Sequence, residues 1–114
     1  MKVSVLIANY NNEKYLAESI NSVRKQNYQN IEIIVHDDAS SDNSIKKINK
    51  YKKIFIKKNK KRSNYGSYNQ MNAYFRAFKK SNGEVIFFLD SDDLFKKNKI
   101  KTIKKKILKK IKIY

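Results

Sequence analysis

The sequence predicts an α/β fold with a mostly parallel sheet and flanking helices. Two observations support this. Short apolar runs rich in β-branched and aromatic residues alternate with segments whose apolar residues recur at helical spacing. The chain has 114 residues, a length that suits one domain with a modest core.

The first half of the chain is expected to alternate strand and helix twice. Residues 3–8 and 31–35 are apolar runs of β-formers and are predicted as buried strands. Between them, residues 13–26 have apolar residues at helical spacing, and Asn12 can cap that helix. A second helix is expected over 42–53.

The second half is expected to continue the alternation. Residues 54–56 form a weak third strand, and a basic loop follows. A helix is predicted over 66–80, and its aromatic residues are expected to pack in the core: Tyr74, Phe75 and Phe78. Residues 84–89 form the most apolar strand.

A Lys-studded amphipathic helix is expected from Asp93 onward, because isoleucines recur there at helical spacing: Ile100, Ile103, Ile107 and Ile111. This stripe either packs against the core or lies at an interface, and packing is the favoured alternative. We divide the chain into a domain over 1–95 and this C-terminal helix over 96–114.

The net charge of +17 is concentrated in two segments, 45–62 and 96–114, each with ten basic and no acidic residues. Lys outnumbers Arg 24 to 3, which argues against sequence-specific nucleic-acid binding because Arg is the usual base-recognition residue. Solvated Lys surfaces are the simplest explanation, and peripheral contact with an anionic membrane is the alternative. Without Cys, disulfide scaffolds and thiol catalysis are excluded. A cytoplasmic location is expected, with any membrane contact at the inner face.

All six Asp residues follow predicted strands within a few positions: Asp37, Asp38, Asp42, Asp90, Asp92 and Asp93. Right-handed crossovers bring the C-terminal ends of parallel strands to one edge of the sheet. Ligands of such sheets bind at that edge. The sequence therefore predicts a ligand site built from these strand ends.

Asp90 and Asp92 form an Asp-x-Asp pair after the most apolar strand. Carboxylate oxygens suit Mg²⁺ or Mn²⁺, which can bridge them to the phosphates of a ligand. The alternative is that Ser91, Asp92 or Asp93 only caps the last helix.

Two further strand ends carry candidate ligand contacts. Asp38 can accept hydrogen bonds from a ribose or a base, or it can be a turn residue bonded to nearby backbone. Tyr10 can stack on a base and Asn9 can bond to one, or both can belong to an ordinary turn. His36, the single histidine, is expected at a strand end without a catalytic role.

In this order and spacing, the segments 3–12, 31–44 and 83–93, together with Gly66 and Asn72, resemble the N-terminal half of the family 2 glycosyltransferases. The resemblance covers roughly residues 2–95. It implies a Rossmann-like GT-A nucleotide-binding half that binds a nucleoside diphosphate sugar, most often a UDP-sugar, for transfer to an acceptor in glycan synthesis.

The resemblance also implies roles for individual residues. Ala8, Asn9 and Tyr10 would line the nucleoside pocket, and Asp38 would hold the base. Asp90 would contact the ribose or the metal, and Asp92 would bind Mn²⁺ or Mg²⁺.

Three departures from the family pattern qualify these roles. Ala8 stands where Pro is frequent, and Met71 stands where a basic residue is frequent. The acceptor-binding half and its general base are expected to be missing, as in a truncated copy, so the catalytic residues and the acceptor are unassigned. A noncatalytic basic module that contacts a membrane or a polyanion is the alternative function.

Overall fold

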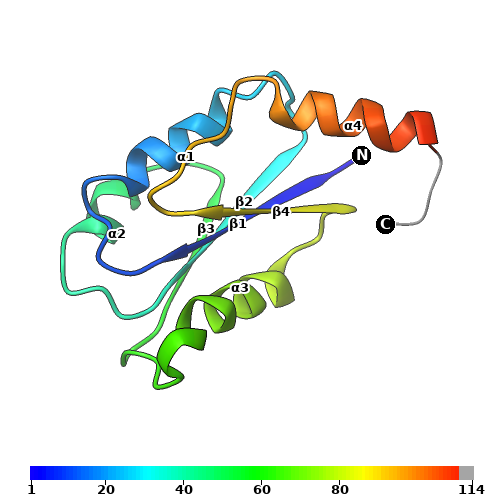
Figure 1. Ribbon diagram of the computed structural model, residues 1–114. Helices are drawn as coiled ribbons and strands as arrows, with labels where there is room; N and C mark the ends of the chain where they lie inside the picture. Colours follow the sequence, from blue (N-terminus) through cyan, green and yellow to red (C-terminus); the bar gives the residue numbers. More distant parts are fainter. Residues whose placement is uncertain (111–114) are drawn as a thin grey trace.

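The four strands form one parallel sheet in the order β3-β2-β1-β4, which confirms the predicted fold class (Figure 1). A computed structural model describes residues 1–110. The elements are β1 (Val3–Asn9), α1 (Leu16–Arg24), β2 (Ile31–Asp37), α2 (Ser44–Ile48), β3 (Ile54–Lys58), the 3-10 turn η1 (Gly66–Tyr68), α3 (Asn69–Lys80), β4 (Val85–Asp90) and α4 (Lys99–Lys110).

Helices cover both faces of the sheet, but unequally. Figure 1 shows α1, α2 and α4 on one face and α3 alone on the other. Alternate residues of β1 point to opposite faces: Val5 joins the large core cluster on the α1 side, whereas Leu6 packs on the α3 side. Both side chains are fully buried, so β1 is the centre of the fold.

The helix expected over 13–26 is shorter in the structure. The backbone N–H groups of Tyr15 and Leu16 both bond to the carbonyl of Asn12, at 3.0 and 2.9 Å, which makes a turn before α1. The side chain of Asn12 does not cap this helix, because it donates to the hydroxyl of Ser91 instead. The expected N-cap was therefore wrong.

The helix expected over 42–53 is also much shorter and spans only Ser44–Ile48. Asp42 does bond to the backbone N–H of Ser44, at 3.0 Å, at the start of this helix. Lys53 has a φ of 62°, so the backbone leaves the right-handed helical region immediately before β3. The predicted helix was too long because apolar residues keep a helical spacing beyond Ile48, where α2 ends and the turn toward β3 begins.

The prediction that the aromatic residues of α3 lie in the core was wrong for Phe75 and Phe78, which are 56% and 50% exposed. Tyr74 is half-buried against a small cluster. The buried residues of α3 are Ala73 and Ala77. Small side chains let the helix approach the sheet closely, and the aromatic rings lie to the side of that contact.

The last helix begins at Lys99, later than the Asp93 start that we expected. Ile100 is 1% exposed and belongs to the large core cluster, and Ile103 packs against it. These two residues support the packing alternative for the isoleucine stripe, while Ile111 lies outside the described residues. No helix within residues 1–110 is long and apolar enough to cross a membrane.

Candidate functional site

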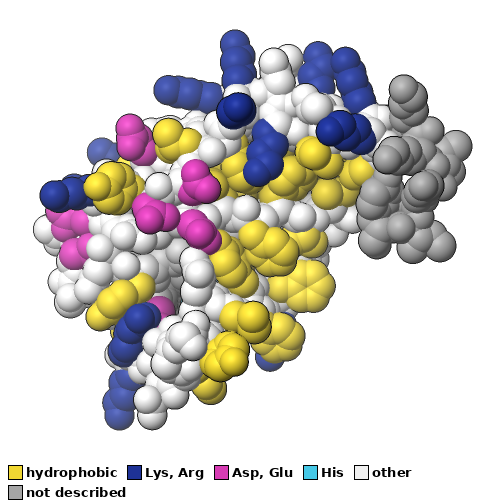
Figure 2. All heavy atoms as spheres, viewed as in Figure 1, with side chains coloured by type: hydrophobic (Ala, Val, Ile, Leu, Met, Phe, Trp, Pro, Cys, Tyr) yellow, Lys and Arg dark blue, Asp and Glu magenta, His cyan; other side chains and the backbone are white. Residues whose placement is uncertain are grey.

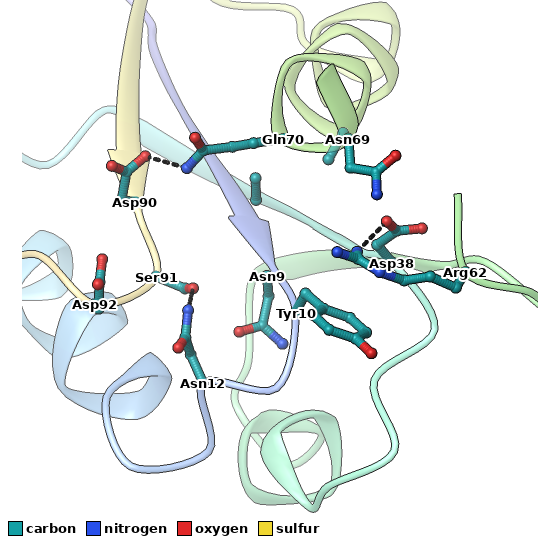
Figure 3. A pocket seen from close by; sticks show the side chains of 12 residues that line it. Asn9, Tyr10, Asn12, Asp38, Arg62, Asn69, Gln70, Asp90, Ser91 and Asp92 are labelled. Atoms are coloured by element: carbon teal, nitrogen blue, oxygen red, sulfur yellow. Dashed lines mark hydrogen bonds and ion pairs between the residues drawn. The ribbon is translucent and has the colours of Figure 1, made fainter. Parts of the chain in front are cut away.

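The sheet order creates a crevice where β1 and β4 end side by side. From β1 the chain moves outward to β2 and β3, then crosses to the other side of β1 to form β4. Ligands of open α/β sheets bind at such a switch point, beyond the C-terminal ends of the strands. A pocket of about 230 Å³ lies there (Figure 3), lined by Ala8, Asn9, Tyr10, Asn12, Asp38, Arg62, Asn69, Gln70, Ala73, Asp90, Ser91 and Asp92.

All six residues that the sequence nominated for binding line this one pocket. They come from three strand ends, and the register pairs Ala8 of β1 with Asp90 of β4. Figure 3 shows Tyr10 and Asp38 at one end of the pocket and Asp90 and Asp92 at the other. Their individual binding roles stay predictions.

Asp38 is buried and held by residues far away in sequence. It accepts hydrogen bonds from Asn59 at 2.9 Å, from the backbone and hydroxyl of Ser63 at 2.8 Å each, and from Arg62. Burial raises the pKa of Asp38, but the hydrogen bonds from Asn59 and Ser63 and the charge of Arg62 outweigh it and lower the pKa. Asp38 is therefore an ionised side chain with long-range partners, unlike a simple turn residue.

Tyr10 presents its ring to the same end of the pocket and is 40% exposed. The guanidinium carbon of Arg62 lies 3.4 Å from the centre of that ring. Arg62 thus contacts both Tyr10 and Asp38, the two residues expected to hold a base.

Asn9 has a structural role through its side chain. Its amide donates to Asp37 at 2.8 Å and to Ser44 at 3.0 Å, and the residue is 2% exposed. These bonds tie the end of β1 to the end of β2 and to the start of α2. Asn9 borders the pocket, but its amide nitrogen is already engaged.

At the opposite end, Asp90 accepts hydrogen bonds from Gln70, at 2.8 Å, and from the hydroxyl of Tyr74. Burial and the Asp90 carboxylate raise the pKa of Tyr74, so this hydroxyl stays protonated and donates. Both donors come from α3 and lie four positions apart, on one side of the helix. They orient one oxygen of Asp90.

Asp92 is exposed beside Asp90, and no described residue donates a hydrogen bond to its carboxylate. The helix-capping alternative for the Asp-x-Asp pair is wrong, because α4 begins only at Lys99. Asp93 instead accepts a bond from the backbone N–H of Leu94 at 2.8 Å.

The donor set at this end fits a hard divalent cation. Asp90 and Asp92 supply carboxylate oxygens, and Mg²⁺ is commonly held by one or two carboxylates with waters and substrate phosphates completing its shell. Within residues 1–110 there is no cluster of three or more potential His, Cys, Asp or Glu ligands. A cation held by Asp90 and Asp92 would therefore need further oxygen atoms from water or from the phosphates of a molecule bound in the pocket.

Two of the six aspartates serve the fold. Asp37 accepts a bond from the backbone N–H of Ser40 at 3.0 Å, and Asp42 accepts one from the backbone N–H of Glu13 at 3.0 Å. Asp37 is therefore a turn residue bonded to nearby backbone. His36 lies near the end of β2, as expected, and is buried outside the pocket lining.

Sequence reasoning did not single out Arg62, Asn69 or Gln70, which also line the pocket. For Gln70, the available signal was its spacing of four residues from Tyr74 on one helix. Arg62 and Asn69 reach the pocket from segments outside the strand ends, and no periodic pattern marks them. Met71, by contrast, is 66% exposed and is not part of the lining.

The four glutamates lie outside the pocket lining. Glu32 forms an ion pair with Lys2 at 3.3 Å, at the opposite edge of the sheet, near Glu84. Glu13 accepts a bond from the backbone N–H of Asn43 at 2.7 Å, and Glu18 is exposed on α1. Within the described residues, no glutamate is placed to act as a general base.

Comparison of the sequence with known proteins connects this site to one family. The family described as glycosyl transferase family 2 matches residues 4–112. TarS of Staphylococcus aureus, a poly(ribitol-phosphate) beta-N-acetylglucosaminyltransferase, is 36% identical over 104 residues, covering 89% of this chain and 18% of TarS. WfgD of Escherichia coli, a UDP-Glc:alpha-D-GlcNAc-diphosphoundecaprenol beta-1,3-glucosyltransferase, is 39% identical over 98 residues, covering 86% of this chain and 38% of WfgD.

Solved structures agree with the sequence comparison. The crystal structure of S. aureus TarS 1–349 in complex with UDP superposes with a TM-score of 0.86 at 31% identity, covering 96% of this chain and 32% of that one. A Pyrobaculum calidifontis mannosyltransferase in complex with GDP-Man and Mn²⁺ shares the fold, with a TM-score of 0.71 at 20% identity, covering 82% of this chain and 28% of that one. The chain thus spans well under half the length of these relatives. On its sequence, its parallel sheet and its strand-end pocket, the chain belongs to glycosyl transferase family 2.

Proposed function

We propose that this chain binds a nucleoside diphosphate sugar, specifically a UDP-sugar, together with Mn²⁺ or Mg²⁺, as the donor-binding part of a glycosyltransferase in glycan synthesis. The observation that carries the proposal is that the two ends of one pocket differ in chemistry. An aromatic ring and a buried carboxylate lie at one end, and two exposed carboxylates lie at the other (Figure 3).

Each end suits one part of the donor. The Tyr10 ring offers a stacking surface, and ionised Asp38 can accept a hydrogen bond from a base N–H. Asp90 and Asp92 would repel a bare diphosphate, so a divalent cation between carboxylates and phosphates makes this end compatible with the ligand. The solved TarS structures in complex with UDP and with UDP-GlcNAc support this choice of nucleotide.

When bound, the cation would offset the negative charge that develops on a departing diphosphate. The chain's own contribution is to position the nucleotide at the strand ends and to orient Asp90 through Gln70 and Tyr74. Attack by an acceptor hydroxyl also needs a general base. None of the described glutamates is placed for that step, so transfer by this chain alone is not part of the proposal.

The test is UDP binding, measured by isothermal titration calorimetry with and without Mn²⁺. The expected Kd is millimolar or better with Mn²⁺ and at least roughly tenfold weaker without it, equivalent to about 1.4 kcal/mol. Asp92→Asn removes the charge at nearly constant size and should abolish most of the metal-dependent gain.

Asp93→Asn is the matched control, since Asp93 is an exposed neighbouring carboxylate outside the pocket lining. It should leave the Mn²⁺-dependent affinity unchanged. Equal UDP affinity with and without Mn²⁺ would disprove the metal-bridged site, and no UDP binding at all would disprove donor binding.

A peripheral contact with an anionic membrane is a second proposal, supported by the surface of α4. Ile100 belongs to the core cluster and Ile103 packs against it, while four lysines of the helix are exposed: Lys99, Lys101, Lys105 and Lys106. Figure 2 shows Lys and Arg side chains gathered along this part of the surface. Such a surface attracts anionic lipid without inserting apolar residues. Binding to phosphatidylserine vesicles should fall steeply between 50 and roughly 200 mM salt. Absence of vesicle binding at low salt would contradict it.

A further inference from the structure

Arg62 occupies the end of the pocket where the proposed function places the base. Its guanidinium carbon lies 3.4 Å from the centre of the Tyr10 ring, within the range of a close cation–π contact. It also forms an ion pair with a carboxylate oxygen of Asp38. Figure 3 shows the Arg62 side chain extending across this end, between Tyr10 and Asp38.

The two contacts of Arg62 use the same groups that a base would need. A planar guanidinium covers the ring face on which a planar base would stack. The ion pair takes up one oxygen of Asp38, and Asn59 and Ser63 bond to the other. A base and the Arg62 guanidinium therefore compete for one place.

The size of the pocket agrees with this competition. Its volume of about 230 Å³ lies below the roughly 300–1,000 Å³ of sites for small molecules. Arg62 is part of the wall that limits it. The Arg62 side chain is 41% exposed, whereas that of Asp38 is 3% exposed. The arginine can therefore leave toward solvent, while the buried carboxylate stays in place.

We propose that Arg62 is a placeholder for the nucleobase, which must be displaced from Tyr10 and Asp38 before the nucleotide binds. This inference rests on the proposed function. It makes Arg62 a residue that weakens binding of the base and protects the buried charge of Asp38 when the pocket holds no nucleotide. After its displacement, Asp38 keeps its bonds from Asn59 and Ser63 and can accept one from the base.

Uridine is the most direct probe, because it contains the base and no phosphate. Replacing Arg62 also removes a positive charge that attracts the diphosphate over a distance. With UDP, that loss of affinity would obscure the gain expected at the base. We expect Arg62→Ala to bind uridine about twofold to thirtyfold more tightly than wild type in an NMR titration, the range that corresponds to losing one cation–π contact. Arg62→Gln should shift the affinity in the same direction.

Lys61→Ala is the matched control, since it removes the same charge from the adjacent exposed position without touching the pocket lining. Its uridine affinity should equal that of wild type. In wild type, the Nε–H resonance of Arg62 should move when uridine is added, because the guanidinium loses its ring contact.

The outcomes separate the two proposals. If wild type binds UDP with Mn²⁺ while Arg62→Ala and Arg62→Gln bind uridine equally or more weakly, Arg62 is no placeholder and the donor site still stands. If neither wild type nor the two variants bind uridine or UDP, the donor site fails and the placeholder fails with it.

Discussion

The two faces of the sheet are stabilised to very different degrees. The α1 face holds thirteen buried side chains in one cluster, from all three helices on that side, from β1, β2 and β4, and from Phe95 between β4 and α4. On the α3 face the buried apolar cluster has only three side chains, Leu6, Ile34 and Ala77. The same strands supply both faces, so the difference comes from the number of helices that cover each one.

The α3 face also exposes large apolar side chains. Among them are Met71, Phe75, Phe78 and Phe88, which line a shallow groove of about 560 Å³ with Tyr74. In Figure 2, apolar side chains gather in the right-hand half of the molecule, below the lysines of α4. The stability of this chain therefore depends mainly on the α1 face, while the α3 face positions Asp90 of the pocket through Gln70 and Tyr74.

The largest effect is expected for Ile20→Ala in the α1 cluster. Ile20 is fully buried, so truncation removes apolar contacts and leaves a cavity, at a cost of about 2–5 kcal/mol in unfolding free energy. Urea denaturation followed by circular dichroism measures it. Ile20→Val should cost only about 0.5–1.5 kcal/mol. If Ile20→Ala lost less than about 2 kcal/mol of unfolding free energy, the assignment of stability to this face would be contradicted.

A smaller loss is expected for Ala77→Leu on the other face. Ala77 is 1% exposed against Leu6 and Ile34, and extra methyl groups would push α3 away from the sheet. Overpacking of this kind costs about 1–3 kcal/mol. The same urea titration tests it, and an unchanged midpoint would show that α3 can move without cost.

His36 should make the α3 face sensitive to pH. Burial and the positive charge of Arg76 on α3 lower the pKa of His36. The side chain of Asn59 and the negative charges of Asp37 and Asp38 raise it, but by less, so the pKa is lowered overall. The unfolded chain then takes up a proton first, so stability should fall as the pH drops below about 6.5, by up to about 1.4 kcal/mol per pH unit.

Urea midpoints at pH 7.5, 6.5 and 5.5 measure this dependence. His36 is the single histidine of the chain, and carboxylates of lowered pKa such as Asp38 lose their contribution only in more acidic solution. His36→Gln should flatten the dependence over this window. An unchanged slope in that variant would exclude His36 as its origin.

The smallest effect is expected for Phe75→Ser on the exposed side of α3. Phe75 is 56% exposed, so its replacement should change the free energy of unfolding by no more than about 0.5 kcal/mol. Urea denaturation again measures it. A loss comparable to that of Ile20→Ala would mean that the two faces contribute equally.

The sequence by itself determined the order of the elements, the parallel sheet and the strand ends that build the pocket. These features depend on local periodicity and on the fixed handedness of strand crossovers. The positions of Tyr10, Asp38 and Asp92 at one edge follow from that logic. The limits of α1, α2 and α4 do not, because helical spacing continues beyond the points where turns end the helices.

Only the tertiary structure decided which apolar residues are buried and which long side chains reach the pocket. Phe75 and Ala77 lie on one amphipathic helix, yet the close approach of α3 to the sheet buries the alanine and leaves the ring in solvent. Arg62 reaches Tyr10 and Asp38 because the chain after β3 folds back over the strand ends. Contacts between residues so far apart in sequence depend on the path of the whole chain, which no local pattern encodes.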